Sequence, residues 1–138
     1  MRGRVFRLAA ALLLAAASHA QARGGGGCLR EGTPVGTPRG SVAVEHLSAG
    51  DRIVTFDRGR FEAGRVVAKA RVAAGETVEI SFPGGAVVAT ETHPFAVGSG
   101  VYRMAGRLRT GDTLFIRDRD ALRPVPVLSV RRVPGTAI

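Results

Sequence analysis

Three side chains that could act together on an acyl group lie far apart in the sequence: Cys28, Thr90 and His93. A thiolate is a strong nucleophile, an imidazole can carry a proton near neutral pH, and a hydroxyl can donate or accept a hydrogen bond. Pro94 favours extended backbone at His93, and side chains alternate along a strand, so Thr90 and His93 need a bend or bulge between them to serve one site. The residue types suggest Cys-centred acyl chemistry; the spacing alone does not prove it.

The chain from Cys28 onward has the pattern of an all-β domain. Short runs of β-branched and apolar residues are interrupted by Gly, Pro and Asp roughly every eight to twelve residues. No segment has the length and periodicity of a stable amphipathic helix. The candidate strands are 35–37, 41–44, 52–56, 65–71, 77–82, 86–90, 95–97, 101–104, 113–117 and 125–131.

A short motif occurs twice in the chain. Residues 47–53 (LSAGDRI) are echoed 61 residues later by 108–114 (LRTGDTL). Each copy has a leucine, a Gly-Asp turn and the start of an apolar strand; glycine tolerates positive φ, and aspartate can bond nearby backbone. The echo predicts a pseudo-symmetric duplication, although Leu-x-x-Gly-Asp can also recur by chance.

The first 22 residues have the features of a secretory signal peptide. They combine a basic start, an apolar run at 8–17 that is shorter than the roughly 20 residues of a membrane span, and small residues at candidate cleavage positions. An N-terminal core helix is the alternative. We therefore expect export to the periplasm or outside the cell, a Gly-rich spacer over 23–27, and one domain over 28–138.

Charge and cysteine count limit the partners. The formal charge of +9 partly belongs to the leader, the remaining arginines are scattered and aromatics are few, so nucleic acid binding is not expected. A single cysteine, Cys28, excludes an internal disulfide in an exported chain. A lipoprotein site at Cys28 is disfavoured because four glycines separate it from the apolar run.

Four segments in order resemble the Hint domain, the module shared by hedgehog autoprocessing regions and inteins. They are 28–40 (CLREGTPVGTPRG), 44–53 (VEHLSAGDRI), 90–97 (TETHPFAV) and 108–112 (LRTGD). Each is weak alone, but their order is specific and they span most of the chain. Pro94-Phe95 is most similar to the bacterial Hint domains of secreted polymorphic toxins.

The resemblance implies a flat, horseshoe-like, pseudo-twofold all-β fold and a self-cleaving site. By this resemblance Cys28 attacks the carbonyl of Gly27 in an N-to-S acyl shift, His93 is the general acid for the departing nitrogen, and Thr90 positions the bond. The substrate is the chain's own N-terminal segment, the scissile bond is Gly27–Cys28, and no cofactor is expected.

The sequence also departs from the family pattern. It ends without the His-Asn of splicing inteins, so splicing is not expected, and the last strands of the fold look truncated at the C-terminus. No residue matches the hedgehog steroid-transfer aspartate. The alternative function is a catalytically silent, truncated Hint remnant acting as a small secreted β module.

Other interpretations of the same residues stay open. Cys28 could be a small core residue, His93 a structural residue at a strand end, and the pair a hydrolase acting in trans, which lacks an evident oxyanion loop or orienting acid. A zinc site from Cys28, His46 and His93 has no supporting Cys-x-x-Cys or His-x-x-x-His spacing, so no metal is expected.

Overall fold

The computed structural model describes residues 11–12, 27–57, 59–73, 75–98 and 100–135. The predicted signal peptide (1–22), apart from Ala11–Leu12, and the predicted spacer, apart from Gly27, lie outside these residues. Within them the chain forms twelve strands and two 3₁₀ turns, and no α-helix. The predicted all-β class is therefore confirmed. None of the described residues forms a helix long and apolar enough to cross a membrane.

Each half of the domain contains two antiparallel hairpins. In the first half they are β2 (Pro34–Thr37) with β3 (Gly40–Ala43), and β4 (Arg52–Asp57) with β5 (Arg60–Arg65). In the second half they are β8 (Pro94–Gly98) with β9 (Val101–Met104), and β10 (Thr113–Asp118) with β11 (Ala121–Pro126). A 3₁₀ turn follows the first hairpin of each half: η1 (Val44–His46) and η2 (Ala105–Arg107).

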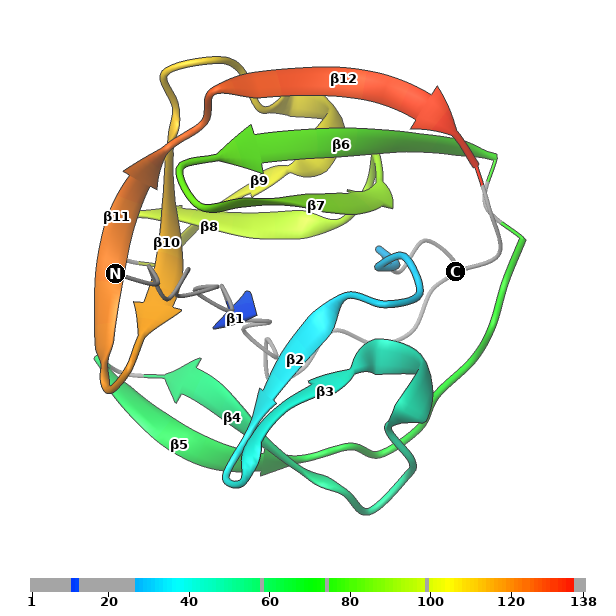
Figure 1. The fold of residues 1–138 in the computed structure, drawn as a ribbon, viewed down its shortest axis with the longest axis vertical. Helices are drawn as coiled ribbons and strands as arrows, with labels where there is room; N and C mark the ends of the chain where they lie inside the picture. Colours follow the sequence, from blue (N-terminus) through cyan, green and yellow to red (C-terminus); the bar gives the residue numbers. More distant parts are fainter. Residues whose placement is uncertain (1–10, 13–26, 58, 74, 99, 136–138) are drawn as a thin grey trace, which may run out of the picture.

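A three-stranded sheet joins the halves. It consists of β6 (Glu76–Phe82), β7 (Gly85–Thr90) and β12 (Ser129–Pro134) in the order β12-β6-β7. Burial nearly alternates along β6, so one face packs into the core, where Ile80 is completely buried. The core continues to Leu114 and Val127 of the second half. In Figure 1 this three-stranded sheet lies along the top of a flat, open ring, with β10 and β11 on the left and β4 and β5 at the bottom.

The two Leu-x-x-Gly-Asp segments have the same backbone hydrogen bonds. The N–H of Ser48 donates to Asp51 Oδ2 at 2.8 Å, and that of Arg109 donates to Asp112 Oδ2 at 2.8 Å. The glycine before each aspartate has a positive φ, 94° at Gly50 and 90° at Gly111. The echo in the sequence is thus a structural duplication.

The relation between the halves is nearly twofold at their junction. Leu29 forms an isolated antiparallel bridge with Ala89. The N–H of Thr90 donates to the carbonyl of Cys28 at 3.0 Å, and the N–H of Arg30 donates to that of Val88 at 3.0 Å. Residues 60 apart in the sequence are exchanged between the two bonds: Cys28 takes the place of Val88, and Arg30 that of Thr90. The pseudo-twofold axis therefore passes between Leu29 and Ala89, the pair at the centre of the bridge.

Two predicted strands are wrong in their bounds. The interval 65–71 is not a strand, since β5 ends at Arg65, and 125–131 is divided between β11 and β12. Both breaks have one cause. Val66 exchanges hydrogen bonds with the turn before β4, donating to the Asp51 carbonyl at 2.9 Å, and Val127 donates to the Asp112 carbonyl at 2.7 Å. Each valine continues the register of its own hairpin, but it bonds both residues of the Gly-Asp turn, so the regular ladder ends there.

Three strands lie wholly or largely outside the predicted ranges: β1, β5 and β11. β11 contains Pro124 and Pro126, which suit it because it is the edge of its sheet. The segment predicted as a signal peptide contains β1 (Ala11–Leu12), which pairs antiparallel with β10 and parallel with β2. This pairing depends on contacts far along the chain, and two residues carry no strand signal of their own.

Candidate functional site

The junction between β7 and β8 contains the bend that Thr90 and His93 require. β7 ends at Thr90, residues 91–92 form a turn, and the N–H of His93 donates to the Thr90 carbonyl at 3.0 Å. The His93 carbonyl accepts the N–H of Ala105, at the start of η2, at 2.8 Å. The predicted bend is confirmed, and His93 is held by its backbone on both sides.

Cys28 reaches this junction by pairing with β7. Its carbonyl accepts the N–H of Thr90, and its own N–H donates to Thr90 Oγ1 at 2.9 Å. This N–H belongs to the peptide bond between Gly27 and Cys28. The Thr90 hydroxyl therefore holds the nitrogen of the predicted scissile bond.

His93 is almost completely buried, with 3% of its surface exposed. Its ring packs against Phe95 at a centroid distance of 5.0 Å, and its Nδ1 has no hydrogen-bond partner among the described residues. Burial lowers the pKa of His93 below its ordinary value, while the Gly27 backbone beside the imidazole acts in the opposite direction. Burial thus favours the neutral form of the ring.

The structure thus brings together Cys28, Thr90 and His93, with Gly27 beside them. Cys28 is half-buried and outside the apolar core cluster, which does not fit the interpretation as a core residue. His46 is exposed, at the end of η1. No three His, Cys, Asp or Glu side chains in the described part of the chain are grouped so that they could hold a metal ion.

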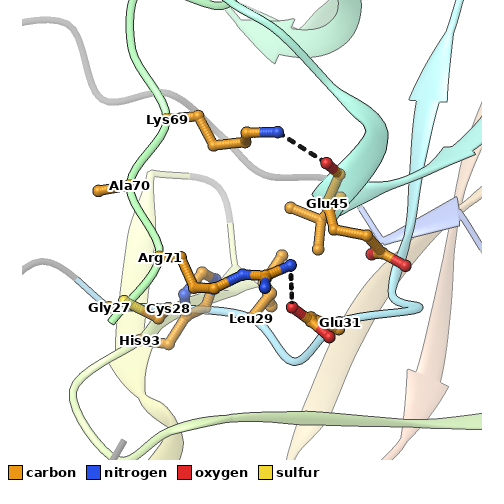
Figure 2. Close-up of a pocket in the computed structure, with 10 residues that line it drawn as sticks. Gly27, Cys28, Leu29, Glu31, Glu45, Lys69, Ala70, Arg71 and His93 are labelled. Carbon is orange, nitrogen blue, oxygen red and sulfur yellow. Dashed lines mark hydrogen bonds and ion pairs between the residues drawn. The ribbon is translucent and has the colours of Figure 1, made fainter. Parts of the chain in front are cut away.

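An open pocket of about 340 Å³ lies next to the predicted scissile bond. Figure 2 shows Gly27, Cys28 and His93 together at one side of it. The segment 66–73, between β5 and β6, forms another wall with two cations. Lys69 Nζ donates to the Glu45 carbonyl at 2.7 Å, and Arg71 forms an ion pair with Glu31 (Figure 2).

A charged cluster supports the turn between Thr90 and His93. Arg132, on β12, lies 2.6 Å from Glu91 Oε1 and 2.8 Å from Glu76 Oε2. The Glu91 carbonyl also accepts the N–H of Gly106 at 2.9 Å. Sequence reasoning missed this cluster and the cations of 66–73, since neither has a local motif and both depend on contacts between distant segments.

Comparison with known proteins agrees with this geometry. The family model of the Hint domain matches residues 27–81. The MchDnaB-1 intein is 30% identical, with a TM-score of 0.65, and the match covers 80% of this chain and 82% of that one. The splicing domain of the Msm DnaB1 intein is 26% identical, with a TM-score of 0.63 and coverage of 80% and 82%.

A bacterial intein-like domain from Clostridium thermocellum is 24% identical over 79% of this chain and 80% of that one, with a TM-score of 0.67, which shows a shared fold. No curated protein matches the chain. The identity to the MchDnaB-1 intein over most of both chains, together with the family match and the fold, shows that this chain belongs to the Hint family of hedgehog and intein domains.

Proposed function

We propose that this Hint domain cleaves its own chain at Gly27–Cys28 by an N-to-S acyl shift. The Cys28 thiol attacks the carbonyl carbon of Gly27, the bond to the Cys28 nitrogen breaks, and that nitrogen becomes an amine as a thioester forms. The observation that best supports this reaction is the hydrogen bond from the Cys28 N–H to Thr90 Oγ1, because it places a polar side chain on the nitrogen that must leave. Thr90 would fix the orientation of this amide.

His93 would act as the general acid for the leaving nitrogen. A neutral imidazole is too weak an acid for this role, so it must first bind a second proton. The Cys28 thiol can supply that proton, because it loses one as it attacks. His93 would therefore take the thiol proton and return it to the nitrogen, and the reaction needs no net proton. A low pKa favours this sequence, because a permanently protonated ring could not accept the first proton. The unpartnered, buried Nδ1 is available for such an exchange within the described site.

The substrate in this proposal is the segment that precedes Cys28. We also propose that the domain is exported by its leader, to the periplasm or beyond, and that it is related to the Hint domains of secreted bacterial toxins. The basic start and apolar run of the leader and the Pro94-Phe95 pair support these two proposals.

A fusion with a large reporter before Gly24 tests the reaction. Hydroxylamine or dithiothreitol should release the reporter, since both attack a thioester, and hydroxylamine should leave a hydroxamate on Gly27 that intact mass identifies. Cys28→Ala should abolish release because it removes the nucleophile. A folded parent fusion that stays intact under both reagents would instead support the silent β module.

A further inference from the structure

The backbone of Gly27 lies against the backbone of His93. A Cβ placed on Gly27 would be 2.1 Å from His93 Cα and 2.7 Å from both its N and Cβ atoms. Carbon atoms in contact are normally about 3.5–4.0 Å apart. Three atoms of one residue therefore occupy the space that any side chain at position 27 would need.

His93 cannot move aside to make this space. Its N–H is bonded to the Thr90 carbonyl at 3.0 Å, its carbonyl to the N–H of Ala105 at 2.8 Å, and its side chain is buried. A shift of the His93 backbone would break these bonds at both ends. Gly64 shows the contrasting case, since a Cβ there would meet the Thr55 methyl group at 2.8 Å, and that group can rotate away.

The other side of the contact is equally fixed. Cys28 is held to Thr90 by two hydrogen bonds, and Leu29 is bridged to Ala89. A residue with a Cβ at position 27 could be accommodated only if the chain before Cys28 turned away from the site. That movement would take the scissile carbonyl away from His93.

We infer that this site acts only on a chain with glycine immediately before Cys28, and that the His93 backbone is the element that excludes all other residues. The inference rests on the proposed cleavage. It defines the substrate as a glycyl-cysteine peptide bond and the first product as a thioester of a C-terminal glycine. A reaction that consumes this product would be an acyl transfer from glycine to an incoming nucleophile.

Gly27→Ala in the reporter fusion is the direct test. Release by hydroxylamine should slow by roughly 100-fold or more, the usual cost of displacing reacting groups by about an ångström. Gly75→Ala is the matched control, since Gly75 has no atom within 4 Å of a Cβ and no positive φ; it should cleave at the parent rate. Gly27→Ala cleaving at the parent rate would overturn the inference.

A second measurement separates this inference from the proposed function. In a Cys28→Ala background, which cannot cleave, the amide proton of residue 28 should be protected from solvent exchange by Thr90. Adding Gly27→Ala should reduce that protection, and adding Gly75→Ala should not. If the parent fusion never cleaves, the proposed function fails, but the exchange measurement still tests whether a side chain fits between position 27 and the His93 backbone. Unchanged protection in the Gly27→Ala variant would show that it fits and would overturn the inference.

Discussion

Thr33 and His93 occupy equivalent positions in the two halves of the domain. Each precedes a proline, each is buried, and each donates its N–H to the carbonyl three residues earlier, at 3.1 Å for Thr33 and 3.0 Å for His93. Each carbonyl accepts the first N–H of the following 3₁₀ turn, at 2.9 Å and 2.8 Å. The Thr33 hydroxyl is satisfied by the Arg30 carbonyl at 2.6 Å, whereas Nδ1 of His93 has no partner among the described residues. One half has a hydroxyl bonded within its own turn at this position, and the other has the imidazole that we propose as the general acid.

The low pKa of His93 predicts a pH-dependent stability. The unfolded chain, with an ordinary pKa of 6.5, binds the proton more tightly than the folded one. The free energy of unfolding should therefore be highest above about pH 6.5 and should fall as the pH drops through and below that value. Urea unfolding of the Cys28→Ala protein between pH 5 and 7.5 measures this. His93→Gln should flatten the slope and His46→Gln, at an exposed position, should not; a slope unaffected by His93→Gln would contradict the assignment.

Thr90 and His93 should differ in their effect on cleavage. In the reporter fusion, His93→Ala should slow release by roughly 100- to 10,000-fold, the usual contribution of a positioned acid or base. Thr90→Val should cost less, because the hydroxyl only positions the amide, and Thr90→Ser should recover most of the rate. Thr92→Val, at an exposed position in the same turn, is the control. Equal cleavage rates for the valine and serine variants at position 90 would show that the Thr90 hydroxyl does not position the amide.

The duplicated turns should contribute similar stability. Asp51→Ala and Asp112→Ala each remove a side-chain hydrogen bond of 2.8 Å to the backbone, and each should cost about 0.5–1.5 kcal/mol of unfolding free energy. Asp112 also lies 2.7 Å from Arg103, so its loss should be the larger of the two. Urea unfolding at pH 7 compares them. A neutral effect at one site only would argue against equivalent turns.

Arg132 should support the turn between Thr90 and His93 without contributing much to global stability. It is 68% exposed, so Arg132→Met should lower the unfolding free energy by less than about 1 kcal/mol. Cleavage should slow more than stability falls, because Glu91 loses its ion pair beside Thr90 and His93. Arg131→Met, one residue away and paired with Glu79, is the matched control. Identical cleavage rates for the two variants would show that Arg132 does not support cleavage.

The sequence predicted what local patterns determine. Alternating apolar runs indicated an all-β chain, the Leu-x-x-Gly-Asp echo indicated the duplication, and the order of four motifs selected Cys28, Thr90 and His93. It did not predict the ends of β5 and β11, because each regular ladder stops where Val66 or Val127 meets the Gly-Asp turn before the partner strand, a contact between residues fifteen apart. Nor did it show the closeness of Gly27 to His93, which only the pairing of residues 28–30 with β7 creates.

The pseudo-twofold bridge between Leu29 and Ala89 bears on how many copies of the site the fold can hold. In a symmetric dimer built from one half, a residue on the axis would face its own copy, as an isologous interface requires. Every other position would occur twice, so such a dimer would carry two identical sites. In this chain the counterparts of Cys28, Thr90 and His93 are Val88, Arg30 and Thr33, none of which can perform the same chemistry. Because both halves lie in one polypeptide, the two copies of each position can differ, so one half can carry the proposed reactive set while the other supports it.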